Sequence, residues 1–198
     1  MSAIPGTVPI FANENWQLPS RGRVGMFALI IGESAIFTIF VVAYIYYIGR
    51  STYGPGPQIL EIPIFNSVCL ISSSLTIILA EHAIKHGRLR AFAAWWALTM
   101  LLGLEFLAGT AMEWRRLIFE DHLTLRTNLF GTTFYSLVGL HATHVVVGMT
   151  GLSLVMLFTV LGRVEQRHAE RIQVLALYWH FVDAVWVVVF TVVYMLGR

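Results

Sequence analysis

The sequence has little charge for its size. Only 12% of its 198 residues are charged and 57% are hydrophobic, whereas a soluble domain usually carries about a quarter charged residues. The mean hydropathy of +0.72 agrees with this balance. The formal charge of +2 comes from basic residues in short segments between apolar runs, so nucleic acid is not an expected partner. The composition predicts a protein dissolved in lipid.

Cysteine is almost absent, and so is any leader-like segment. The single cysteine, Cys69, lies inside an apolar run, which excludes a disulfide within the chain and predicts a small buried hydrophobic side chain. Residues 1–23 hold three prolines and no apolar stretch long enough for the core of a signal peptide. We expect residues 1–23 to form a cytoplasmic N-terminal arm.

Long hydrophobic runs fill the rest of the chain. Five of them cover 24–48, 62–84, 91–114, 129–161 and 172–196, and each reaches the roughly 20 residues that a helix needs to cross a bilayer. None alternates as a barrel strand would, and only helices or closed barrels satisfy their backbone groups in lipid. The predicted fold is all-α: residues 24–198 form an integral membrane bundle of five transmembrane helices. The run 129–161 is long enough to tilt strongly or to extend beyond the headgroups.

The basic residues are distributed unevenly between the two sides of such a bundle. Because cytoplasmic loops carry an excess of Lys and Arg, the count predicts a cytoplasmic N-terminus and an outside C-terminus. The side of the N-terminal arm holds eight basic residues and the other side five: Arg21, Arg23, Lys85, Arg88, Arg90, Arg163, Arg167 and Arg171, against Arg50, Arg115, Arg116, Arg126 and Arg198.

The predicted spans contain acids and histidines, but no arginine or lysine lies well inside them. An ionised carboxylate near the bilayer centre costs at least about 2.5–3.5 kcal/mol, so each must be protonated, hydrogen-bonded, hydrated or turned toward a partner. We predict that these residues face the bundle interior or an interface, as an intramembrane polar network or a lipid cleft. They are Glu33, Asn66, Glu81, His82, Glu105, Glu113, His141, His144, His180 and Asp183.

Spacing along the spans groups some of these residues. Counting from the cytoplasmic ends places Glu33, His180 and Asp183 in one layer, roughly 12–17 Å deep. His141 and His144 are three residues apart, as are His180 and Asp183, so each pair shares a helical face. The expected role is interhelical hydrogen bonding worth about 1 kcal/mol or less per bond. Metal or haem ligation is the alternative, because His-x-x-His and His-x-x-Asp both place two donors on one side.

Five stretches, in order along the chain, resemble one known family. Together they are similar to subunit III of the haem-copper terminal oxidases (cytochrome c oxidase), in its short five-helix bacterial form, and also to the equivalent subunit of quinol oxidases. The resemblance covers residues 24–197. The stretches are IGESAIF at 31–37, LEIPIFN at 60–66, GTTFY at 131–135, GLHATHV at 139–145 and YWHFVDAVW at 178–186.

The resemblance implies a function for the chain. It would be a non-catalytic subunit of a proton-pumping oxidase in the bacterial plasma membrane, active in aerobic respiratory electron transport. It would hold no haem or copper itself and no catalytic residue, and would dock beside subunit I, with subunit II and other subunits nearby. It would bind phospholipid in a cleft beside Glu33, sustain proton uptake and protect the catalytic site from inactivation during turnover. Arg163 and Arg167 are candidates to hold a lipid phosphate.

Other readings and some departures from the family stay open. The alternatives are an accessory subunit of a quinol oxidase or a nitric oxide reductase, and a self-contained membrane metalloenzyme using His141, His144, His180 and Asp183. Thr110 stands where many relatives carry glutamine, and Glu105 is an additional acid. The two extra helices that build one cleft wall in longer relatives are missing.

Overall fold

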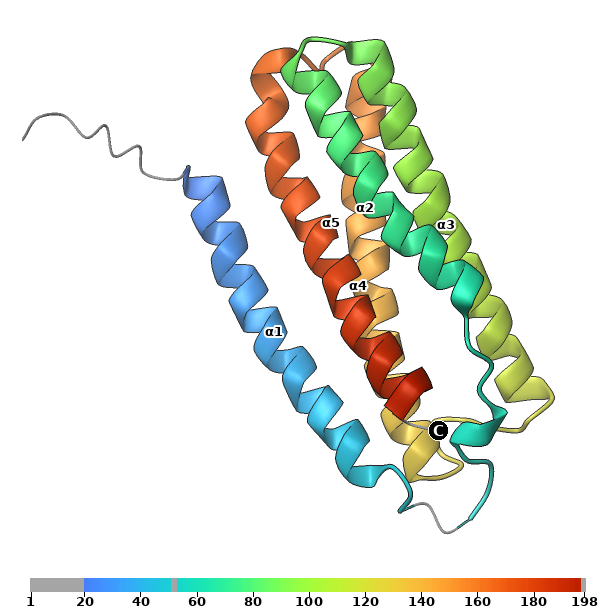
Figure 1. Ribbon diagram of the computed structural model, residues 1–198. Helices are drawn as coiled ribbons and strands as arrows, with labels where there is room; N and C mark the ends of the chain where they lie inside the picture. The colour runs from blue at the N-terminus through green and yellow to red at the C-terminus, as the bar shows by residue number, and fades with distance from the viewer. Residues whose placement is uncertain (1–19, 51–52, 197–198) are drawn as a thin grey trace, which may run out of the picture.

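The computed structural model describes residues 20–50 and 53–196, and this part of the chain is helical with short connections (Figure 1). Five helices in it are long and apolar enough to cross a membrane, which confirms the predicted number. They are α1 (Arg21–Tyr47), α2 (Ile64–Lys85), α3 (Leu89–Phe119), α4 (Leu129–Val160) and α5 (Ala169–Phe190). Single-turn 3₁₀ segments η1 (Pro57–Ile59) and η2 (Gln166–His168) lie in the loops, and the π-helical η3 (Thr191–Leu196) prolongs α5. The predicted arm at 1–23 lies mostly outside the described residues, and α1 already begins at Arg21.

Helix α3 continues beyond its predicted end at residue 114, through two arginines, to Phe119. The guanidinium of Arg116 pairs with Glu61 and donates to the carbonyl of Ile59 at 3.2 Å, both in the loop before α2. The loop before α2 therefore compensates the positive charge of Arg116. Because the backbone amide of Glu120 still bonds the carbonyl of Arg116 at 2.8 Å, the helix continues past the apolar segment.

Helix α1 is the most loosely attached of the five. It packs chiefly against α4 and α5, whereas α2 packs against α3 and α5, and α4 against α3 and α5. Figure 1 shows α1 set to one edge of the bundle. Only two of its residues, Phe37 and Tyr44, are buried. The bundle core is therefore formed by α2 to α5, with α1 laid against one side.

The indole of Trp179 fills the centre of this core. It sits between Gly103 of α3 and Gly148 of α4, where an added Cβ would lie 2.9 Å and 2.8 Å from ring atoms. The absence of side chains at both glycines lets α5 approach α3 and α4 closely, as small residues do in membrane bundles. The indole nitrogen donates to Ser73 Oγ at 2.8 Å, so Trp179 also joins α5 to α2.

The loops meet at two opposite ends of the bundle. At one end the Gln166 amide donates to the Lys85 carbonyl at 2.6 Å, joining the α2–α3 and α4–α5 connections. At the other end the Asn128 amide donates to the carbonyls of Tyr53 and Pro55 at 3.0 Å and 2.9 Å. We call these the Lys85 end and the Asn128 end. The N-terminal end of α1 lies at the Lys85 end, and the chain leaves η3 at the Asn128 end (Figure 1).

Candidate functional site

The central polar contact of the bundle joins α1 to α4. Glu33 Oε2 lies 3.0 Å from His144 Nε2, and the two side chains are 24% and 13% exposed. The other ring nitrogen, Nδ1, lies 2.8 Å from the Leu140 carbonyl. The backbone oxygen of His144 accepts a bond from the Tyr178 hydroxyl of α5 at 3.2 Å. The Glu33–His144 pair is therefore held by three helices.

The two bonds of His144 determine the charge of the pair. A carbonyl can only accept, so His144 Nδ1 carries a proton and donates to Leu140. One further proton then lies between Nε2 and Oε2, either on Glu33 or on the imidazole. In both arrangements the pair has no net charge, so it needs no lysine or arginine at this depth. It can pass a proton between a carboxyl group and an imidazole without changing the charge of the bundle.

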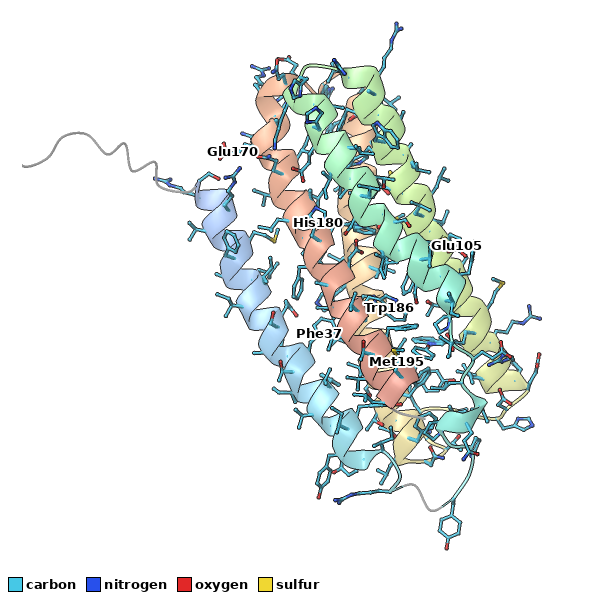
Figure 2. The ribbon with its side chains drawn as sticks, in the orientation of Figure 1. Phe37, Glu105, Glu170, His180, Trp186 and Met195 are labelled. Atoms are coloured by element: carbon cyan, nitrogen blue, oxygen red, sulfur yellow. The ribbon has the colours of Figure 1, made fainter. Side chains whose placement is uncertain are left out.

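The second histidine of the motif, His141, has different surroundings. It is fully buried, and neither ring nitrogen has a hydrogen-bond partner among the residues that the structure describes. Its ring lies 5.0 Å from that of Trp186, 5.8 Å from Phe106 and 6.5 Å from Phe37, measured between ring centres. Figure 2 shows Phe37 on α1 and Trp186 on α5. His141 therefore packs as an aromatic side chain.

A second polar cluster joins α2 to α5 and is called the Ser74 cluster. Ser74 Oγ donates to Asp183 Oδ2 and lies 3.0 Å from His180 Nδ1. Because the serine proton goes to the carboxylate, His180 Nδ1–H is the donor to Ser74. Asp183 is 5% exposed, and its other oxygen, Oδ1, has no partner within the described residues. The layer predicted for Glu33, His180 and Asp183 thus divides, with Glu33 bonded to α4 and the other two to α2.

Two further predicted residues near the Asn128 end, Asn66 and Glu113, line a small pocket. A pocket of about 290 Å³ is lined by Glu61, Asn66, Gly109, Glu113 and Arg116, among others. The Tyr194 hydroxyl, in η3, donates to Glu113 at 3.1 Å and 3.2 Å. The pocket therefore combines two carboxyl groups with one guanidinium. The guanidinium of Arg116 already pairs with the carboxylate of Glu61.

Three predicted residues lie apart from these clusters. Glu81, near the Lys85 end, accepts from Gln173 at 3.4 Å and lies 3.9 Å from Lys85. Glu105, on α3 (Figure 2), contacts the thiol of Cys69, while its buried Oε2 has no hydrogen-bond partner in the described part of the chain. His82 is exposed at the end of α2, against His86. The ten predicted residues therefore form several separate contacts and not one network.

The two candidate lipid-binding arginines lie in the α4–α5 loop, and both are exposed. Arg167 pairs with Glu165, with guanidinium nitrogens 3.0 Å and 3.2 Å from its carboxylate. Arg163 follows α4 after Leu161 and Gly162.

The candidate metal ligands do not converge. His141 faces aromatic rings, His144 bonds Glu33, and His180 and Asp183 bond Ser74. In the described part of the chain, no group of three His, Cys, Asp or Glu side chains is arranged to hold a metal ion.

Sequence reasoning missed the partners that complete these contacts. Ser74 and Tyr194 are neither acidic nor imidazole groups, and the signal available for Ser74 was the run of three serines, 72–74, inside an apolar span. Tyr194 lies near the end of the last span, where tyrosine is common at a membrane interface, so its position did not mark it as a partner of Glu113.

These features define a class: a multi-pass membrane protein whose bundle satisfies buried acids and imidazoles by pairing between helices. Comparison with known proteins specifies it further. The family model for cytochrome c oxidase subunit III matches residues 17–198. Cytochrome c oxidase subunit 3 of Alkalihalophilus pseudofirmus is 32% identical over 177 residues, covering 88% of this chain and 86% of that protein.

Two further relatives carry the same name. The protein from a Bacillus species is 30% identical over 195 residues, which cover 96% of this chain and 94% of that protein. The protein from a Synechocystis species is 36% identical over 188 residues, which cover 90% of this chain and 77% of that protein. The chain belongs to the cytochrome c oxidase subunit III family.

Proposed function

We propose that this chain is the non-catalytic subunit III of a proton-pumping haem-copper terminal oxidase in aerobic respiratory electron transport. The observation that carries the proposal is the family match over residues 17–198, which includes every helix of the bundle. The chain would support oxygen reduction by subunit I without contributing a catalytic centre of its own.

The haem and copper of this complex would lie in partner subunits. Subunit I would be the direct partner, and subunit II and other respiratory subunits would complete the complex. The side-chain contacts support this assignment, because His144, His180 and Asp183 already have partners within the bundle. Aromatic rings surround His141, with the indole of Trp186 tilted 31° from its plane.

The complex would lie in a bacterial plasma membrane, with the Lys85 end facing the cytoplasm. The distribution of basic residues supports this orientation. The α2–α3 and α4–α5 connections meet at the Lys85 end, and Lys85, Arg88, Arg163 and Arg167 lie in or beside them. The excess of basic residues is therefore gathered at one end of the molecule, as the positive-inside rule requires for the cytoplasmic end.

Phospholipid would bind along α1. A groove of about 210 Å³ between α1 and α5 is lined mainly by apolar side chains, among them Phe37, Val41, Val185 and Val189. Such a surface suits an acyl chain, and it exists without the two extra helices of longer relatives. Arg163, exposed at the Lys85 end, would be positioned for a lipid phosphate.

Glu33 and His144 would link lipid binding to sustained proton uptake and protection from turnover inactivation. The pair lies between α1 and α4, with Ser34 and Phe37 of the groove on the following turn of α1. Because it holds one shared proton without net charge, it can exchange that proton at low cost within the membrane.

We expect Glu33→Ala to leave the bundle inserted but to reduce retained lipid or shorten the turnover lifetime of the oxidase. Glu33→Gln separates the causes, because an amide still donates to His144 Nε2 but holds no exchangeable acid proton. Ile39→Ala, at an exposed residue of α1 outside the lining of the groove, is the matched control. Phosphate analysis of the purified complex and the number of turnovers before inactivation are the measurements. Unchanged lipid and lifetime in Glu33→Ala would remove the special role of Glu33.

Purification in mild detergent tests the assignment itself. We expect the chain to co-purify with subunits that hold haem and copper, and the isolated chain to show no haem absorbance and no stoichiometric iron or copper. Co-purification with a quinol-oxidising or nitric oxide-reducing enzyme would redirect the proposal to those complexes. Haem or metal retained by the isolated chain would favour a self-contained metalloenzyme.

A further inference from the structure

Two histidines at the Lys85 end are not used by the proposed function. His82 lies in the last turn of α2 and His86 is the residue at its C-terminal cap. Both side chains are exposed, and their ring centres are 4.2 Å apart with the planes tilted by 37°. The four-residue spacing places both imidazoles on one face of the helix. They form the only histidine pair at this spacing in the sequence.

The ring spacing fits two ligands on one ion. A nitrogen ligand lies about 2.1 Å from a transition-metal ion such as zinc, which puts the imidazole centre about 3.2 Å from that ion. Two such rings would have their centres roughly 4.5 Å apart at the right angle of an octahedral or tetragonal ion, and roughly 5.2 Å apart at the tetrahedral angle that zinc prefers. The observed 4.2 Å is shorter than both values, so the exposed side chains would rotate apart to complete the geometry.

One of the two rings is already oriented for ligation. His86 Nδ1 lies 2.8 Å from the His82 carbonyl, to which it donates. The proton on Nδ1 leaves the lone pair of Nε2 available, and this tautomer is the one that metal-binding histidines usually adopt. The helix C-terminus also favours a cation, because its carbonyl groups carry partial negative charge.

We propose that His82 and His86 form a binding site for a divalent transition-metal ion that prefers imidazole, such as Zn²⁺. Water completes the coordination, because the described residues provide no group of three ligand side chains. Lys85 lies 3.9 Å from Glu81, which compensates part of the positive charge nearby. With only two protein ligands, the site is open and reversible and not a structural metal centre.

Calorimetric titration of the full chain with Zn²⁺, in detergent and without a polyhistidine tag, tests the site. We expect one ion to bind with micromolar Kd, and Mg²⁺, which prefers oxygen ligands, not to compete. His82→Ala and His86→Ala should each weaken binding about tenfold or more, because the second imidazole acts at high effective concentration. His122→Asn, at an exposed histidine in the α3–α4 loop, should bind as the parent does.

Three results would overturn the proposal. The parent chain might bind no Zn²⁺ below about 1 mM, which is the affinity range of nonspecific contacts. Binding might be equal in the parent, His82→Ala and His86→Ala. Alternatively, His168→Ala in the α4–α5 loop might abolish binding while His82→Ala does not, which would assign the ion to other ligands. Helix content by circular dichroism, unchanged in each variant, shows that the fold is retained. None of these outcomes depends on whether the chain assembles with an oxidase.

Discussion

At the scale of single residues, hydroxyl groups determine how the buried acids and imidazoles are satisfied. Ser74 is the clearest case, because one oxygen bonds both His180 and Asp183 and thereby joins α2 to α5. Ser73 and Ser67 accept from the indoles of Trp179 and Trp186 on the same helix pair, at 2.8 Å and 3.1 Å. The serines of α2 are therefore the hydrogen-bonding surface onto which α5 docks.

Removing the Ser74 hydroxyl should weaken this surface. In Ser74→Ala the buried Asp183 loses a hydroxyl donor and His180 loses its acceptor, so we expect a loss of about 0.5–2 kcal/mol in unfolding free energy. SDS-induced unfolding in mixed micelles gives the value. Ser153→Ala, at an exposed serine of α4, is the control and should change stability little. Equal stability of both variants would contradict the role assigned to Ser74.

His180 belongs to the same cluster, and its loss should be structural in effect. We expect His180→Ala to lower the stability of the bundle or its retention in the complex, because Ser74 loses the donor that holds it in place. The haem content of the remaining intact complex should not change. Visible absorbance per mole of catalytic subunit, alongside the yield of the complex, measures both effects. A complex that keeps its subunits but loses haem would show that His180 acts on a cofactor.

At the scale of helices, close packing in the core depends on two glycines, Gly103 and Gly148. An added Cβ at Gly148 would lie 2.8 Å from the ring of Trp179, the α5 residue against which α3 and α4 pack. At Gly32 of α1, none of the described residues lies within 4 Å of such an atom. The same substitution therefore has opposite consequences at the two positions.

We expect Gly148→Ala to destabilise the bundle by about 1–3 kcal/mol, as overpacking of a filled core does. Gly32→Ala should be neutral or slightly stabilising, because alanine is the better helix former by about 1 kcal/mol. Thermal unfolding of the two purified variants in the same detergent compares them directly. A Gly148→Ala protein as stable as the parent would show that the indole can move aside.

Helix α1 shows why element boundaries were easier to predict than element packing. Its apolar composition predicted a span at 24–48, and the structure has a helix at Arg21–Tyr47. Nothing in its sequence indicated that it would be buried only at Phe37 and Tyr44. That outcome depends on the faces that α4 and α5 leave available, which are set by contacts far apart in the chain.

At the scale of the whole molecule, the two ends differ in charge and in how their loops are joined. The Lys85 end holds the α2–α3 and α4–α5 connections, and the Asn128 end holds the other two loops. Because the chain crosses the membrane five times, alternate loops lie on the same side. The charge count grouped the loops in the same way. The side of the membrane that each end faces remains a proposal.

Labelling with a membrane-impermeant maleimide tests that orientation. In a Cys69→Ala background we expect Arg88→Cys, at the Lys85 end, to react only from the cytoplasmic side. Leu125→Cys, in the exposed α3–α4 loop, should react only from outside. Intact cells and inverted vesicles provide the two sides, and the reverse labelling pattern would invert the topology.

The sequence predicted which polar residues lie in the spans, but not which of them meet. Ten were predicted because a polar or ionisable side chain in an apolar run is conspicuous. Glu33 was grouped with His180 and Asp183 by depth along the helix, yet its partner is His144. Depth is one coordinate only, and the rotation of each helix about its axis decides which residues of a layer meet. His82, expected in the polar network, instead lies exposed beside His86, because the helix end carries it beyond the packed core.

The sequence by itself determined the class of protein, the five helices and the family, because lipid imposes long apolar helices and the family's motifs are local in the chain. Only the tertiary structure decided the pairing of Glu33 with His144, the separation of His141 into an aromatic pocket, and the bridging role of Ser74. Those outcomes depend on helix rotation and on the close approach allowed at Gly103 and Gly148. Such packing is a property of several helices together, and it is not encoded in the periodicity of any one of them.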